Sequence, residues 1–267
     1  MIKILLYFAI FFAIPVAASL LPLDQFTRNC LVVVVLFLLT YILYRKEGKS
    51  LAALGITAKW KTLRFLPLGL LMGIIFFCML LFFQKLFNGL TISLNPNANY
   101  ALIAKGLIWA LPGVLMEEII FRGYCLHKST YKIGPVKANL LFAFFFIAWH
   151  WLAFNAWGNW GMMLSLITTG FGHVFFAVAL GRSQTLFFPI ALHLGNNWAQ
   201  RNLFALNMGK IIDTKQVNDS LFLTSESGVQ FSTMHIVVAY AITFACFIIS
   251  TVIILLIFKR RPVKEAT

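Results

Sequence analysis

Eight apolar stretches, each near the length of a membrane-spanning helix, follow one another along this chain. About 20 apolar residues in a helix cross the hydrocarbon core of a bilayer. Lipid offers no hydrogen-bond partners to the backbone, and the alternation typical of a membrane barrel is missing, so the stretches are predicted to be helices. We therefore predict an all-α fold, a polytopic membrane bundle of about eight transmembrane helices in one integral domain, residues 1–267. The stretches are roughly 4–22, 30–44, 65–88, 103–126, 137–155, 161–180, 185–204 and 234–258.

The charged residues support a membrane protein and indicate its orientation. Only 11% of the residues are charged, against roughly 25% in soluble domains. With the N-terminus placed in the cytoplasm, 16 of the 22 Lys and Arg residues fall in inner segments, as the positive-inside rule requires. We predict that both termini are cytoplasmic and that the net charge of +14 serves orientation and attraction to anionic lipid, not nucleic-acid binding. The short chain and this charge pattern favour a bacterial plasma membrane, with the endoplasmic reticulum as the alternative.

Three features of the N-terminal third predict details of the fold. Lys3, an apolar run and Val16-Ala17-Ala18 resemble a signal peptide, but we favour an uncleaved first helix. Segment 45–64 alternates apolar and basic residues, which favours a position along the inner membrane surface. Gly69 and Gly73, four residues apart, predict a face where another helix packs closely.

Two adjacent carboxylates, Glu117 and Glu118, interrupt the fourth apolar stretch. Each costs about 2.5–3.5 kcal/mol at bilayer depth, so each needs a partner or a task. Arg122 follows Glu118 by four residues, which predicts an ion pair on one face of the helix. Glu117 is turned about 100° away and keeps its charge available for chemistry.

Polar side chains on two further stretches complete a candidate active site inside the bundle. His150 lies on the fifth stretch, and His193 and Asn197 lie one turn apart on the seventh. Buried polar groups in a bundle pair most cheaply with one another. Peptide hydrolysis needs an activated water and donors for the developing oxyanion, and a carboxylate, two histidines and an amide can supply both. His173 is expected to be structural.

Three short motifs, in order along the chain, resemble those of the CPBP family, the intramembrane CAAX-protease and bacteriocin-processing glutamic endopeptidases. The resemblance covers about residues 103–200, which it marks as the catalytic core. The chain departs from the family pattern at Met116, where some members carry a third acidic residue, and at Ser183–Leu186, which lacks the Gly-Ser often seen there. Neither departure touches the proposed chemistry, and the resemblance does not define the substrate channel. The motifs are Glu117-Glu118-Ile-Ile-Phe-Arg122-Gly123, Phe146-x-x-x-His150 and His193-x-x-x-Asn197.

The resemblance implies an eight-helix bundle that hydrolyses peptide bonds with no cofactor and no obligatory metal. By position, Glu117 and His150 would activate water, and His193 and Asn197 would form the oxyanion site. Glu118 and Arg122 would support them. The partners would be the bilayer and a peptide or protein substrate, prenylated or membrane-embedded, whose identity the sequence does not give.

Three alternatives stay open at the level of sequence. Glu117, His150 and His193 could instead hold a zinc ion with one position left for water, although no His-Glu-x-x-His helix is present. The bundle could be a non-catalytic scaffold or immunity protein, because fold does not fix function. Intramembrane Glu and His residues also serve proton-coupled transporters.

Overall fold

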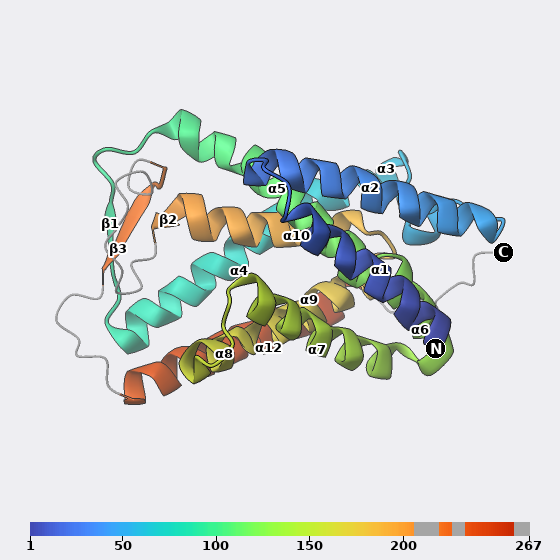
Figure 1. Ribbon diagram of the computed structural model, residues 1–267. Helices are drawn as coiled ribbons and strands as arrows, with labels where there is room; N and C mark the ends of the chain where they lie inside the picture. The colour runs from blue at the N-terminus through green and yellow to red at the C-terminus, as the bar shows by residue number, and fades with distance from the viewer. Residues whose placement is uncertain (206–218, 226–232, 259–267) are drawn as a thin grey trace.

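The computed structural model describes residues 1–205, 219–225 and 233–258 and consists mainly of helices (Figure 1). Three short strands form a sheet in the order β1-β3-β2, with β3 antiparallel to β1 and parallel to β2. They are β1 (Thr91–Leu94), β2 (Phe204–Ala205) and β3 (Phe222–Ser225). The long helices are α1 (Ile2–Ala18), α2 (Gln25–Lys46), α4 (Phe65–Asn88), α5 (Tyr100–Arg122), α6 (Tyr124–Ile133), α7 (Pro135–Ala153), α9 (Thr168–Ser183), α10 (Phe187–Trp198) and α12 (Thr233–Ile257). The short ones are η1 (Leu51–Leu54), α3 (Trp60–Leu63), α8 (Trp160–Leu166) and the π-helical η2 (Ala199–Leu203).

The predicted all-α membrane bundle is confirmed, since each of the eight apolar stretches contains a helix. In the part of the chain that the structure describes, five helical segments are long and apolar enough to cross a membrane, and α1 is a shorter apolar helix. Neither α5, which carries the glutamate pair, nor α10, with 12 residues, is among the five. The five are Gln25–Lys46, Trp60–Asn88, Pro135–Ala153, Trp160–Ser183 and Met234–Ile257.

Several predicted boundaries were wrong. The stretch 103–126 breaks at Gly123, whose ψ of −136° is not helical. The stretch 161–180 is an exception: α8 and α9 together form one segment, Trp160–Ser183, long and apolar enough to cross a membrane. Between them, the Thr168 and Thr169 hydroxyls donate to carbonyls three residues earlier, and such back-bonding bends helices. The stretch 185–204 leaves α-helical geometry after Trp198. Of the polar loop 207–232, residues 207–218 and 226–232 lie outside the described residues.

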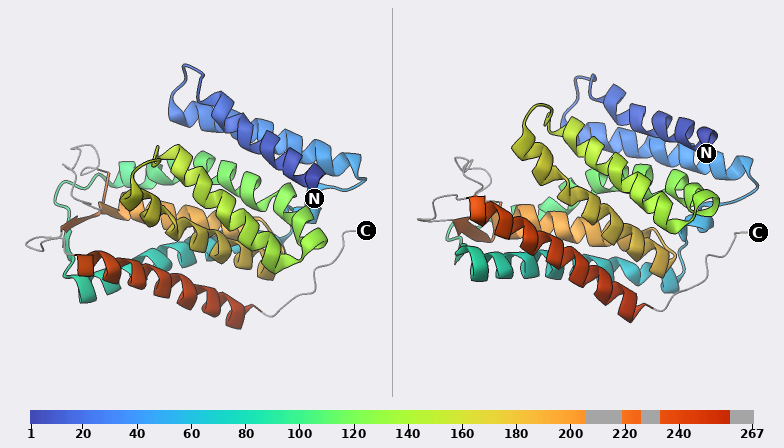
Figure 2. Two further views of the ribbon diagram at one scale, coloured as in Figure 1. Left: turned by 60° about the horizontal axis from the view of Figure 1, so that its bottom comes forward. Right: turned by 90° about the horizontal axis from the view of Figure 1, so that it is seen from below.

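The elements form a bundle with α10 near its centre. Figure 2 shows α10 between α4 and α5, with α1 and α2 on one side of the molecule and α12 on the other. The sheet lies at one end of the bundle. At the opposite end, α1 begins, α2 and α12 end, and α6 lies (Figure 1). This arrangement places α5 and α10, the two helices with the acidic pair and His193, side by side in the interior.

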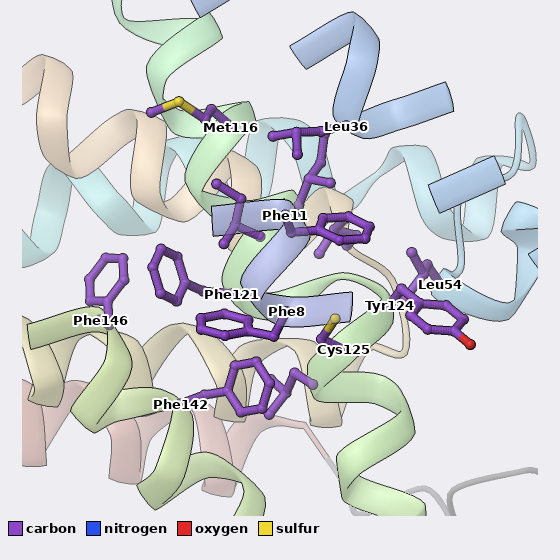
Figure 3. Packing of buried hydrophobic residues seen from close by; sticks show 14 of the residues in the cluster. Phe8, Phe11, Leu36, Leu54, Met116, Phe121, Tyr124, Cys125, Phe142 and Phe146 are labelled. Carbon is purple, nitrogen blue, oxygen red and sulfur yellow. The ribbon is translucent and has the colours of Figure 1, made fainter. Parts of the chain in front are cut away.

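An aromatic cluster fixes the last turns of α5 against α1 and α7 (Figure 3). The ring centroid of Phe8 lies 5.8 Å from that of Phe121 and 5.1 Å from that of Phe142. Phe121 also meets the ring of Phe146 edge-on at 4.8 Å. Edge-to-face pairs of this kind are favourable beyond the area they bury. Because Phe121 directly precedes Arg122, the cluster anchors the helix turn that carries the charged residues.

A polar cluster holds α6 to the end of α2. The Tyr124 hydroxyl donates to Glu47 at 2.6 Å, and Lys128 forms an ion pair with the same carboxylate. The Tyr44 hydroxyl is bonded to Nδ1 of His127 at 2.7 Å. Burial, with the nearby lysines adding to it, lowers the pKa of His127 to about 4, so His127 is neutral at pH 7. The cluster therefore holds α6, the segment that directly follows α5, against the end of α2.

The predicted glycine face lies in close contact with α10. A Cβ atom added at Gly73 would lie 2.1 Å from the carbonyl oxygen of Leu192, and one at Gly69 would lie 2.8 Å from that of Phe188. Gly195 on α10 faces α4 in return, since its Cβ would lie 2.2 Å from the carbonyl oxygen of Leu70. The two backbones meet because neither helix has a side chain at these positions. The prediction of a close-packing face is confirmed.

We expect Gly73→Ala to destabilise the protein by about 1–3 kcal/mol, because the new methyl group meets backbone that cannot give way. It should also lower activity, since Leu192 directly precedes His193. Gly181→Ala on α9 is the matched control, because its Cβ would meet nothing within 4 Å and Ala favours the helix by roughly 0.5–1 kcal/mol. Thermal unfolding in detergent measures both variants. Equal stability of the two would contradict the close packing.

Candidate active site

The centre of the site is a buried ion pair on α5. Nη1 of Arg122 donates to Oε1 of Glu118 at 2.5 Å, and both side chains are 0% exposed. The pair has the i, i+4 spacing that the sequence predicts. Removing either partner would leave a buried charge without a counter-charge. Glu118 and Arg122 therefore stabilise each other in the interior.

His193 on α10 lies between the two carboxylates of α5. Its Nδ1 atom lies 2.8 Å from Oε1 of Glu118, and its Nε2 atom lies 3.8 Å from Oε2 of Glu117. A carboxylate only accepts hydrogen bonds, so Nδ1 carries the proton of the shorter contact. The structure thus brings together four of the candidate residues, Glu117, Glu118, Arg122 and His193, from two helices.

The two glutamates differ in their access to the surroundings. The Glu117 side chain is 19% exposed, whereas that of Glu118 is fully buried. Glu118 is held by Arg122 and His193. Glu117 accepts a long hydrogen bond of 3.5 Å from Nε1 of Trp149 on α7. A reactive carboxylate must reach a water and a substrate, and in this pair only Glu117 meets that condition.

His150 and Asn197 are not joined to the glutamates. Nδ1 of His150 lies 2.8 Å from the carbonyl oxygen of Phe146, one turn earlier on α7. A carbonyl accepts, so this contact fixes the proton on Nδ1 and leaves Nε2 as an acceptor in the neutral ring. Oδ1 of Asn197 accepts a hydrogen bond from Asn196 at 3.3 Å. Both side chains are partly exposed, and neither forms a hydrogen bond or ion pair with Glu117 among the described residues.

Aromatic rings enclose the charged group. The guanidinium of Arg122 lies 4.8 Å from the ring centroid of Phe146 and 5.0 Å from that of Phe176. Sequence reasoning missed Trp149 and Phe176. The chain has 28 Phe and 7 Trp residues, so no pattern distinguishes the two that face a charge. Only the folded arrangement shows them.

His173 on α9 is a further buried polar residue of this region. It is 0% exposed, and its ring lies 5.9 Å from that of Phe146. Within the described residues, neither ring nitrogen has a hydrogen-bond partner. His173 thus contacts the same ring of Phe146 that lies over Arg122.

The zinc alternative requires three ligands to converge on one point. Among the residues that the structure describes, no group of three His, Cys, Asp or Glu side chains is arranged to hold a metal ion. His150 directs Nδ1 to its own helix, and Nε2 is the ring nitrogen left to accept. Whether cleavage survives a chelator decides between the zinc alternative and a carboxylate–histidine site.

Comparison with family models gives a match over part of the chain. Residues 98–199 match the family model described as Rce1-like, type II CAAX prenyl endopeptidase Rce1-like. The matched segment runs from just before α5 to the end of α10 and so contains every candidate residue. Neither the curated proteins nor the solved structures gave a match.

Proposed function

We propose that this chain, whose residues 98–199 belong to the Rce1-like family of type II CAAX prenyl endopeptidases, is an intramembrane endopeptidase that uses Glu117 as its general base. The observation that carries the proposal is that His193 of α10 lies against both carboxylates of α5. His193 contacts Glu118 and faces Glu117, and Arg122 neutralises Glu118. A carboxylate that is neither paired with Arg122 nor fully buried is the group suited to take a proton from water.

In the proposed reaction, Glu117 accepts a proton from water, and the resulting hydroxide attacks the carbonyl carbon of the scissile peptide bond. The C–N bond of the tetrahedral intermediate then breaks, and the leaving amine takes up the proton that Glu117 received. His150 orients the water through its free Nε2, since its Nδ1 is held by Phe146. Because general bases contribute typically 10²–10⁴-fold, Glu117 is assigned a large part of the rate.

The oxyanion is assigned to His193 and Asn197. His193, held through Nδ1 by Glu118, presents Nε2 to the site and donates from it when both ring nitrogens are protonated. The side-chain amide of Asn197, one turn further along α10, supplies a second donor. Preorganised donors of this kind are often the largest single contribution to acyl-transfer catalysis. Glu118 and Arg122 act through His193 and do not touch the substrate.

The proposal includes no metal and places the site in the cytoplasmic half of a bacterial plasma membrane, with both termini cytoplasmic. The substrate is a peptide or protein whose scissile bond reaches Glu117 from the membrane. Type II CAAX prenyl endopeptidase is the description of the matching family, so a prenylated C-terminal peptide is the first substrate to test. The net charge of +14 suits a membrane with anionic lipid on the inner face.

The test incubates the purified protein with a prenylated C-terminal peptide and with the same peptide lacking the prenyl group, each with and without a chelator. Mass spectrometry of the products identifies the bond that is cut. The proposal predicts a new peptide C-terminus that forms equally with chelator present. Activity lost with chelator would favour the zinc alternative, and the absence of any cleavage across a peptide panel would favour the non-catalytic scaffold.

A further inference from the structure

Phe176 on α9 links the ion pair to His193, although it belongs to none of the sequence motifs. Its side chain is buried, with 4% exposed. The ring is stacked on the imidazole of His193, at a centroid distance of 4.7 Å and an interplanar angle of 21°. The same ring lies 5.0 Å from the guanidinium carbon of Arg122. One aromatic side chain therefore contacts both partners of Glu118.

The guanidinium of Arg122 lacks polar partners on most of its edge. Its Nη1 atom donates to Glu118, whereas Nε and Nη2, both buried, have no hydrogen-bond partner among the described residues. The rings of Phe146 and Phe176 lie at 4.8 and 5.0 Å from its central carbon. The electron-rich faces of aromatic rings attract cations, and this attraction strengthens where water is excluded. The two rings thus help to stabilise the charge of Arg122 inside the bundle.

The stacking contact also sets the direction of His193. The hydrogen bond from Nδ1 to Glu118 holds one atom of the imidazole but leaves the ring free to turn about that bond. Stacking on Phe176 fixes the plane of the ring. With one atom and the plane both fixed, Nε2 points toward Oε2 of Glu117, 3.8 Å away.

We propose that Phe176 is a positioning residue, which holds the His193 ring toward Glu117 and helps to stabilise the buried charge of Arg122. This inference rests on the proposed endopeptidase function and adds to it a side chain outside the motifs. It requires that the aromatic face, not merely the volume of the side chain, supports the reaction. A residue that only fills space would affect folding, whereas a positioning residue affects kcat at unchanged KM.

The first experiment compares Phe176→Leu with Phe175→Leu in the peptide-cleavage assay. Phe175 is the neighbouring residue on α9 and is 1% exposed. Its ring packs on Phe76, Phe247 and, at 5.4 Å, Phe176 itself, but among the described residues it makes no ring contact with His193 or Arg122. The two substitutions remove the same atoms from equally buried positions of one helix. We expect Phe176→Leu to lower kcat about tenfold or more with KM unchanged, because misplacement by 1 Å can cost up to about 10²-fold. Phe175→Leu should keep kcat within about twofold at a similar loss of thermal stability.

A second experiment preserves the shape of the side chain. Phenylalanines with one, two or three ring fluorines at position 176 draw electron density from the ring face and weaken its attraction for a cation. We expect kcat to fall stepwise with each fluorine at position 176 and to stay constant with the same series at position 175.

Glu117→Gln, measured in the same assay, separates a failure of the inference about Phe176 from a failure of the proposed endopeptidase function. If Glu117→Gln is inactive but Phe176→Leu and Phe175→Leu have equal kcat, the inference about Phe176 is wrong and the proposed function stands. A flat fluorine series would likewise overturn the role of the aromatic face. If Glu117→Gln keeps full activity, the proposed function is wrong and the inference falls with it.

Discussion

Replacing Glu117 by Gln is expected to lower kcat by about 10²–10⁴-fold, the contribution typical of a general base. Gln has nearly the shape of Glu and still offers an oxygen to the indole N–H of Trp149, which lies 3.5 Å from the carboxylate. What it loses is the ability to take a proton. Because the Glu117 side chain is 19% exposed and is not bonded to Arg122, we expect the thermal unfolding temperature to stay close to that of the wild type.

Glu118→Gln is the matched control for this prediction. The substitution is the same and is made at the adjacent residue, but it removes the charge that pairs with buried Arg122. We therefore expect Glu118→Gln to lower both stability and activity, whereas Glu117→Gln lowers activity alone. Initial cleavage rates and thermal unfolding of the two purified proteins make the comparison. A Glu117→Gln protein that keeps kcat within a few-fold of the wild type would contradict its role as base.

Replacing Arg122 by Met is expected to destabilise the protein by about 3–5 kcal/mol, the usual cost of removing one partner of a buried ion pair. Glu118 would keep its position at 0% exposure with its charge uncompensated. Met fills a similar volume and should pack between Phe146 and Phe176, so the loss reports mainly the charge. Unfolding by graded denaturing detergent, compared with the wild type, measures the difference in free energy.

Two further variants test the explanation for Arg122. Arg64→Met is the control for loss of an arginine, since Arg64 is exposed and its guanidinium lies over one ring, that of Phe65. It should change stability by less than about 1 kcal/mol. The double variant Glu118→Leu/Arg122→Met removes both charges and should recover much of the lost stability without recovering activity. If Arg122→Met is as stable as the wild type, the buried ion pair does not hold the site together.

Local spacing accounts for the parts of the site that the sequence could predict. Glu118 and Arg122 pair because residues four apart lie on the same face of a helix. Gly69 and Gly73 have the same spacing, and so they form one close-packing face. Helix geometry also separates Glu117 from Glu118. These relations lie within single helices, where direction is fixed by 3.6 residues per turn.

Which side chains meet across the helices was beyond prediction. The sequence places His193 and His150 on spans near the glutamates, but it does not say which ring meets which carboxylate. In the structure, His193 lies beside both glutamates, whereas Nδ1 of His150 is bonded to its own helix. The partners Trp149 and Phe176 depend on how α7 and α9 rotate about their axes. This rotation is set by packing between apolar faces. In a chain that is 61% hydrophobic, a helix is apolar on every face, so the sequence does not show which face packs inward.

The short strands and helix breaks escaped prediction for a related reason. The strands β1 and β3 have four residues each and are paired across a long separation in sequence, so no local pattern marks them. The break at Gly123 stands within a run of helix-forming residues. The end of α5 at this glycine nevertheless matters for the site, because it places Arg122 in the last turn.

A double-mutant cycle on Glu117 and His193 tests the central claim most directly, namely that the two act on one reaction centre. It compares kcat for the wild type, Glu117→Gln, His193→Ala and the double variant. The account predicts that the double variant is about as slow as the slower single variant, because groups that act as a unit are strongly non-additive. Losses that multiply, so that the free-energy changes add within about 0.5 kcal/mol, would mark the two residues as independent and would contradict the account.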